Sequence, residues 1–102
     1  MNPVERYLQN ANRGEFQWQC VETTDGYGMG GVQVESVALK GREATITRED
    51  VNEFEVDVIL KHPTEYKGQT TYEVIEYRAS RKSARNLAEK LIKKDIEKDE
   101  VV

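Results

Sequence analysis

Hydrophobic residues near the C-terminus recur with the period of an amphipathic helix. They are Ala84, Leu87, Ala88, Leu91 and Ile92. This spacing gives the segment one apolar side, which must pack on another apolar surface. Ser80 precedes the segment and belongs to the residue types preferred as N-caps. The pattern therefore predicts a helix over about residues 81–95.

Upstream of this helix the hydrophobic pattern has a period of two, which is typical of β-strands. The clearest alternation runs from Glu53 to Leu60, and shorter ones occur near residues 16–21, 32–39 and 44–48. We expect Val34 in the core, followed by a change of phase near residues 35 and 36. The segment 72–77 is apolar on both faces, which predicts a central or covered strand.

Capping and turn residues separate these segments. Asn2 and Pro3 predict the N-cap and first position of an N-terminal helix. Lys40-Gly41 predicts a tight hairpin turn, and residues 62–68 are expected to form a loop.

The order of elements predicts a single α+β domain over residues 1–98, with a frayed tail at 99–102. It comprises an N-terminal helix, an antiparallel sheet of four or five strands, and the amphipathic helix packed on one face. The expected core is Leu8, Phe16, Trp18, Val34, Ile46, Phe54, Val56, Val58, Val74, Ala84, Leu87, Ala88 and Leu91.

Composition narrows the class of protein. No run of the 102 residues approaches the length of a membrane span, and the single cysteine excludes an internal disulfide, so we expect a cytoplasmic protein with no membrane contact. The net charge of −4 is unevenly distributed. Residues 1–77 hold seven Lys/Arg against fourteen Asp/Glu, whereas residues 78–98 hold eight against three.

The start of the predicted C-terminal helix carries an unusual basic cluster, Arg81, Lys82 and Arg85. Cations in a first turn oppose the helix dipole, each at a cost of about 0.3–1 kcal/mol. A local rule broken without visible compensation suggests function, here contact with an anionic partner. On the dipole argument, glutamine at all three positions should leave stability unchanged or slightly raised.

The segment from Ser80 to Leu91 resembles the second helix of double-stranded-RNA-binding domains. Arg81, Lys82 and Arg85 match that family's basic-basic-x-Ala-basic motif, and the helix–strands–helix order is similar. The sequence departs from the family at residues 25–31, which contain neither proline nor histidine, and in one or two additional strands. The resemblance implies contact with nucleic acid, preferably duplex RNA, through these cations.

An acidic stretch supports a second hypothesis from another functional class. Glu53, Glu55 and Asp57 point the same way on one strand, at intervals of about 7 Å. Such a row can bind a hard cation or mimic a row of phosphates, and it is also typical of a solvated sheet face. With Tyr27 and Met29 of the glycine-rich turn, it predicts a protein-binding inhibitor or adaptor of the small phage-encoded type. The sequence leaves partner and oligomeric state open.

No residue pattern predicts catalysis or a cofactor. Cys20 and His62 stand alone, whereas a zinc site needs about four ligands and a nucleophile needs a base. Gly26, Gly28 and Gly31 match a phosphate-loop spacing, but a strand pattern follows them instead of the required helix. We therefore expect a binding protein that is not an enzyme.

Overall fold

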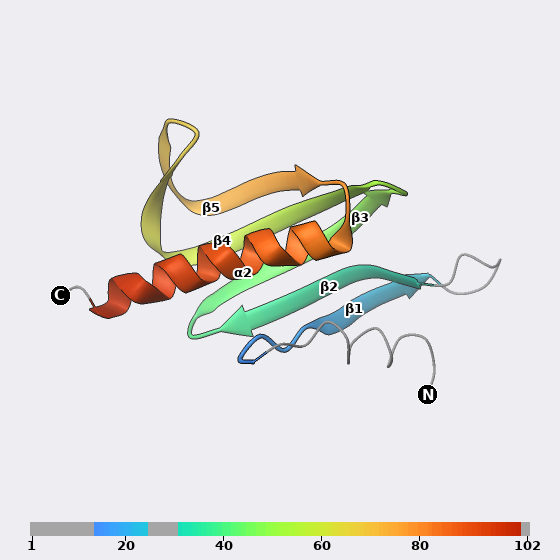
Figure 1. Ribbon diagram of the computed structural model, residues 1–102, viewed down its shortest axis with the longest axis horizontal. Helices are drawn as coiled ribbons and strands as arrows, with labels where there is room; N and C mark the ends of the chain where they lie inside the picture. The colour runs from blue at the N-terminus through green and yellow to red at the C-terminus, as the bar shows by residue number, and fades with distance from the viewer. Residues whose placement is uncertain (1–13, 25–30, 101–102) are drawn as a thin grey trace.

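A five-stranded antiparallel sheet forms one layer of the protein and helix α2 forms the other (Figure 1). The computed structural model describes residues 14–24 and 31–100. The elements are β1 (Gln19–Thr24), β2 (Gly31–Leu39), β3 (Arg42–Asp50), β4 (Glu53–Tyr66), β5 (Gln69–Arg78), α2 (Arg81–Glu97) and a final 3₁₀ turn, η1 (Lys98–Glu100). The predicted α+β class is confirmed for these residues. The predicted N-terminal helix lies outside them.

The strands follow one another in space in chain order, and each pairs antiparallel with the next. Two-residue turns join β2 to β3 and β4 to β5. Lys40 and Gly41 form the first, with φ of 50° and 85°, and Lys67 and Gly68 the second, with φ of 50° and 78°. Positive φ at both central positions matches the twist of a hairpin, and glycine adopts it without steric cost. The hairpin predicted at Lys40-Gly41 is confirmed.

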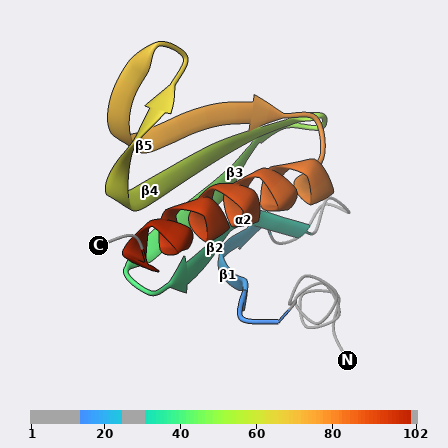
Figure 2. The same cartoon turned by 60° about the vertical axis from the view of Figure 1, so that its left-hand side comes forward.

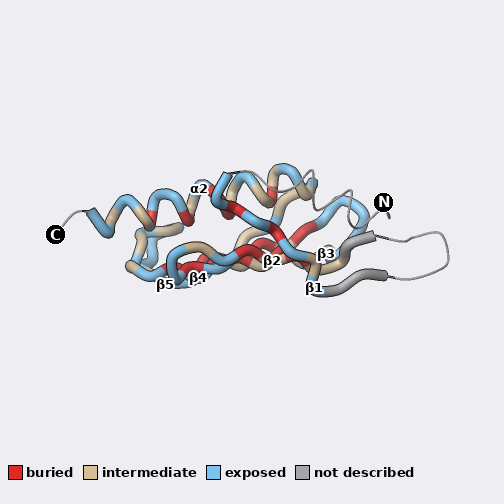
Figure 3. Tube along the Cα trace, turned by 90° about the horizontal axis from the view of Figure 1, so that it is seen from below, coloured by how far each residue is buried: buried red, intermediate tan, exposed pale blue. Residues whose placement is uncertain are grey.

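Alternate residues of the strands point toward α2 and form the core. Figure 3 shows the buried residues in red along the strands and the helix. The helix contributes its small and branched side chains, so its backbone approaches the sheet closely. The buried hydrophobic residues are Phe16, Trp18, Val37, Ala44, Ile46, Phe54, Val56, Val58, Leu60, Val74, Ala84, Ala88 and Ile92. Leu87 and Leu91 pack at the margin of this core. Burial of these hydrophobic side chains between the sheet and α2 holds the two layers together.

Two sequence interpretations of strand faces were wrong. Val34 is only partly buried, because Glu35 and Val37 are the neighbouring residues that face α2. The strand therefore needs no change of phase at residues 35 and 36. The segment 72–77 belongs to β5, which is an edge strand and not a central one. Ile75 and Tyr77 are 49% and 51% exposed on it.

Strand β4 continues to Tyr66, through residues predicted as a loop. Its pairing with β5 is interrupted between Ile59 and Thr64, and beyond this point the hairpin curls away from the rest of the sheet (Figure 2). The interruption leaves backbone groups of β4 without hydrogen-bond partners in β5. Two freed amides, Lys61 N and His62 N, donate instead to the carboxylate of Asp95, at 2.9 Å and 3.2 Å.

Asp95 also binds Arg42, and this pair fixes the C-terminal end of α2 to β3. Both side chains are about 1% exposed, and Arg42 Nε donates to Asp95 Oδ2 at 2.7 Å. The other guanidinium nitrogens donate to both carboxylate oxygens of Asp99, at 2.9 Å and 3.0 Å. Asp99, which the sequence assigned to a frayed tail, thus lies in η1 and anchors it.

Replacement of Asp95 by asparagine should lower the free energy of unfolding by about 2 kcal/mol at pH 7, because it removes the buried carboxylate partner of Arg42 and leaves only the partly exposed Asp99 as its counter-charge among the described residues. Burial alone raises the pKa of Asp95, but hydrogen bonds from Arg42, Lys61 N and His62 N outweigh it and hold that pKa below its ordinary 3.8. A depressed carboxyl pKa contributes stability above the unfolded pKa and loses it as pH falls.

The difference between wild type and Asp95→Asn should therefore shrink below about pH 4. Urea unfolding followed by circular dichroism measures it. The control is Glu97→Gln, two residues away and exposed, which should stay within about 0.5 kcal/mol of wild type. Equal stability of the two variants at pH 7 contradicts the structural role given to Asp95.

Candidate interaction surface

The basic cluster at the start of α2 lies against a buried carboxylate. Ser80 caps the helix, since its Oγ accepts from Ser83 N at 3.1 Å. Arg81 and Arg85 then face β2, where their guanidinium groups donate to Glu35 at 3.1 Å and 3.4 Å. The Glu35 side chain is fully buried. These two arginines thus have a tertiary partner that the sequence pattern did not reveal.

The pKa of Glu35 records a balance between burial and these arginines. Burial raises this pKa above its ordinary 4.5, and the charges and hydrogen bonds of Arg85 and Arg81 oppose the rise. Arg81 also stacks over the Phe54 ring, with 5.0 Å between guanidinium carbon and ring centroid. Arg81 and Arg85 are therefore largely occupied by the fold, with side chains 19% and 15% exposed. Lys82, the third member of the cluster, is exposed.

The face of the sheet that points away from α2 has a different character. It carries six carboxylates, at Glu43, Glu49, Glu53, Glu55, Asp57 and Glu73. Among the described residues none of the six forms an ion pair. Three large side chains stand between them, at Ile59, Ile75 and Tyr77, each about half exposed. We call this surface, the six carboxylates with the three large side chains, the acidic sheet face.

Strand register brings the acidic sheet face together from β3, β4 and β5. Asp57 pairs with Thr45 on one side and Ile75 on the other. In the next row Glu55 pairs with Tyr77, whose hydroxyl donates to Glu55 Oε2 at 3.1 Å. No helix in the described part of the chain covers this face, and α2 lies on the opposite side (Figure 3).

Asp57 is the least well accommodated of these carboxylates. Its Oδ1 atom is inaccessible to solvent and has no hydrogen-bond partner. Burial comes first among the causes that raise the pKa of Asp57 to about 6. A hydrogen bond with Glu73, which only a protonated carboxyl can donate, comes next, followed by the charges of Glu73, Glu55 and Glu43. Ionised Asp57 therefore opposes folding near neutral pH.

The residues considered for a metal or a thiol site lie apart. Residues 14–24 and 31–100 contain no group of three or more His, Cys, Asp or Glu side chains arranged to hold a metal ion, the acidic row on β4 included. Cys20 is a reduced, partly buried thiol on β1. His62 lies on β4 with its Nε2 2.6 Å from Asp99 Oδ1. Tyr27, Met29 and the glycine-rich turn lie outside the described residues.

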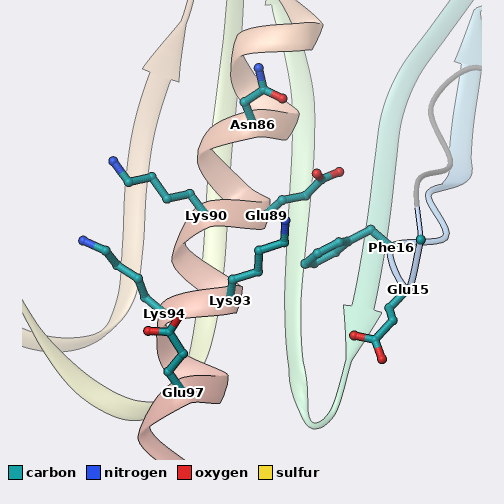
Figure 4. A pocket seen from close by; sticks show the side chains of 9 residues that line it. Glu15, Phe16, Asn86, Glu89, Lys90, Lys93, Lys94 and Glu97 are labelled. Carbon is teal, nitrogen blue, oxygen red and sulfur yellow. The ribbon is translucent and has the colours of Figure 1, made fainter.

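The outer side of α2 carries lysines. Lys82, Lys90 and Lys94 are exposed at intervals of eight and four residues, with no ion pair among described residues. We call these three the lysine ridge. Beside it, a groove of about 620 Å³ separates α2 from Phe16. Lys93 Nζ lies 5.6 Å from the centre of the Phe16 ring. Figure 4 shows Lys93 directed toward Phe16, while the side chains of Lys90 and Lys94 extend away from that ring.

Comparison with known proteins identifies no relative: no family model, curated protein or solved structure matches the chain. Within the part of the chain that the structure describes, no helix is long and apolar enough to cross a membrane. The surfaces themselves must therefore carry any functional argument.

Sequence reasoning found the carboxylates of the acidic sheet face on β4 but missed its apolar part. Ile75 and Tyr77 were assigned to a covered strand, and Ile59 was not singled out. The available signal was the two-sided apolar character of residues 72–77. A strand with apolar residues on both faces can be a central strand that is covered on both sides, or an edge strand that exposes one apolar face to a partner. The sequence pattern is the same in both cases, and only the order of strands in the sheet distinguishes them.

The double replacement Arg81→Gln/Arg85→Gln should destabilise the protein by about 3 kcal/mol at pH 7, because Glu35 stays buried without its counter-charges. This is the opposite of the expectation from the helix dipole alone. The pKa of Glu35 should rise further in the variant, so protonation should restore part of the lost stability as pH falls toward 5.

Urea unfolding at pH 7 and pH 5 tests this, with Lys82→Gln as the control from the same helical turn. Lys82 is exposed, and its replacement should change stability by less than about 0.5 kcal/mol. A double variant as stable as Lys82→Gln at pH 7 refutes the role given to Glu35.

Replacement of Asp57 by asparagine should raise the free energy of unfolding by about 1 kcal/mol at pH 8, after allowance for solvent screening of a partly exposed group. A carboxyl whose folded pKa is raised, here from 3.8 to about 6, loses stability as pH rises through the folded value. The gain should therefore vanish below about pH 4.

Thermal or urea unfolding at pH 8 and pH 4 measures the effect of Asp57→Asn. Glu53→Gln, on the same strand and exposed, serves as the control and should show a change of less than about 0.5 kcal/mol. An Asp57→Asn variant no more stable than wild type at pH 8 argues against a destabilising carboxylate at this position.

Proposed function

We propose that the protein is a cytoplasmic, non-enzymatic docking module that binds a cationic protein through its acidic sheet face. An inhibitor or an adaptor would work in this way, since each acts by occupying a partner's surface. The observation that carries the proposal is the burial of the unpartnered Asp57 Oδ1 atom among carboxylates on a face that also exposes Ile59, Ile75 and Tyr77.

Each part of this observation costs the isolated protein stability or solubility. An unpaired buried carboxylate oxygen costs on the order of 1–3 kcal/mol or more, and large apolar side chains grouped on a surface favour association. A partner that brings lysine or arginine together with aliphatic groups relieves both costs at once. Such a combination of a desolvated centre and a charged surround is typical of protein interfaces.

Electrostatics selects the sign of the partner. The carboxylates of the acidic sheet face form no ion pair with a described cation, so together they repel phosphate and attract basic surfaces. Complementary charge mainly raises the association rate, and its effect declines with salt. The proposal thus implies fast binding at low ionic strength.

The lysine ridge favours a second candidate function, nucleic-acid binding on the opposite layer. Lys82, Lys90 and Lys94 keep exposed charges that no described carboxylate neutralises. Lys90 and Lys94 are four residues apart, a spacing at which like charges repel along a helix. In this form of the hypothesis duplex RNA contacts the lysine ridge, which includes Lys82, while Arg81 and Arg85 support the fold. Three phosphate contacts imply only weak, salt-sensitive binding.

A photo-crosslinking amino acid at two positions distinguishes these functions. Thr47 lies on the outer side of β3, paired with Glu55, and Lys90 lies on the lysine ridge. Crosslinking in cells should give a protein adduct from Thr47, and it should disappear when Glu53, Glu55 and Asp57 are replaced by lysine.

The matched control replaces three exposed acidic residues outside the acidic sheet face by lysine, at Glu15, Glu97 and Glu100. It therefore has the same net charge as the variant with lysine at positions 53, 55 and 57. The Thr47 adduct should persist in this control. Loss of the adduct in both variants, or no adduct in wild type, contradicts docking on the acidic sheet face. A nucleic-acid adduct from Lys90 supports the second candidate.

A further inference from the structure

The acidic sheet face contains two parallel stripes of different chemistry, one on β4 and one on β5. Glu53, Glu55 and Asp57 occupy alternate positions along β4 and form the acidic stripe. Ile75 and Tyr77 occupy alternate positions along the neighbouring strand β5 and form the apolar stripe, with Asp57 opposite Ile75 and Glu55 opposite Tyr77. A ligand lying along the strands therefore meets carboxylates on one side and hydrocarbon on the other.

The repeat of the acidic stripe matches that of a helix. Alternate residues of a strand are about 6.7 Å apart, and residues four apart on a helix rise by about 6.0 Å. Over the three carboxylates the mismatch grows to about 1.4 Å, which flexible lysine or arginine side chains absorb. A helix is also about 10 Å wide, enough to lie over both stripes, because adjacent strands are about 4.8 Å apart.

The inner face of the same sheet already binds a helix in a comparable way. Helix α2 lies over β3, β4 and β5, where it buries Ala84, Ala88 and Ile92 and places Arg81 and Arg85 on a carboxylate of the sheet. The sheet therefore already binds one helix through an apolar strip with cation–carboxylate pairs beside it.

The lysine ridge of a second copy meets only half of these requirements. Its lysines suit the acidic stripe, but its exposed neighbours on α2 include Asn86, Lys93 and Glu97 and no large apolar residue. Docking of a second copy through this ridge would leave Ile75 and Tyr77 without an apolar partner. The occupant that fits is a foreign helix with both kinds of side chain.

We infer that the partner presents an amphipathic helix, with basic residues at four-residue intervals beside a row of aliphatic residues, and that this helix lies along β4 and β5. The inference rests on the proposed function and specifies its partner. On binding, the cations meet Glu53, Glu55 and Asp57, and the aliphatic row covers Ile75 and Tyr77.

Two synthetic peptides of one composition test the inference with the full chain. The first peptide has about 18 residues and is therefore about 27 Å long as a helix. It has a lysine at every fourth position, a leucine three positions after each lysine, and alanine elsewhere. The second contains the same residues with lysine and leucine alternating, as suits a strand. Titration calorimetry at low salt measures affinity, and circular dichroism of the mixture measures helix formation.

The helical-pattern peptide should bind at least about tenfold more tightly than the alternating one, a difference of about 1.4 kcal/mol, and should gain helix on binding. Glu53→Gln/Glu55→Gln/Asp57→Asn should lose most of this affinity, and so should Ile75→Ser/Tyr77→Ser. The control Glu15→Gln/Glu97→Gln/Glu100→Gln should retain it. Circular dichroism of each free variant verifies its fold.

Tighter binding of the alternating peptide, or equal binding of both, overturns the helical partner while leaving docking on this face intact. Equal affinity of wild type and the acidic-stripe variant for both peptides contradicts the proposed function itself. Sedimentation of the protein alone provides a third result. Self-association abolished by the acidic-stripe variant identifies a second copy as the occupant and refutes the foreign helix.

Discussion

Buried ion pairs at both ends of α2 determine how the helix lies on the sheet. At its start Arg81 and Arg85 meet Glu35 of β2, and at its end Asp95 meets Arg42 of β3. Both sets of charges oppose the helix dipole, so α2 is a poorer helix in isolation than on the sheet. Tertiary partners compensate this cost at each end. The ion pairs also fix the direction of α2. A helix lying in the reverse direction would bring its arginines close to Arg42, so the pairs disfavour the reversed orientation.

This pairing explains why the two faces of one sheet differ so strongly. Between the inner face and α2, the three fully buried charges, Glu35, Arg42 and Asp95, are bound by groups of opposite sign. On the outer face six carboxylates have no ion-pair partner among the described residues. The chain therefore places its opposite charges together where it must bury them. On the outer face its uncompensated charges remain available to another molecule.

The sequence predicts those features of the fold that depend on residues close together in the chain, and it does not predict those that depend on distant residues. The N-cap at Ser80, the Lys40-Gly41 turn and the alternation along β4 depend on neighbouring residues, and the structure has each of them. Sheet order and buried polar contacts depend on distant residues, so the exposure of β5 and the pairing of Glu35 could not be derived. Asp95 gave a partial signal, since it continues the apolar stripe of α2 where a hydrophobic residue is expected. A polar residue in a core-facing register implies a buried partner without identifying it.

The acidic sheet face must finally be weighed against a simpler role, protection from aggregation. Charged residues on an open sheet and on its edges prevent unwanted strand pairing, and six carboxylates serve that purpose. Protection alone, however, favours fully solvated charges and polar neighbours, because these cost least. The face instead buries an unpartnered oxygen of Asp57 and exposes Ile59, Ile75 and Tyr77 beside it. Both features reduce the stability or solubility that a protective surface would preserve, and both are relieved by a cationic, partly apolar partner. Docking accounts for the whole surface, whereas protection accounts only for its charge.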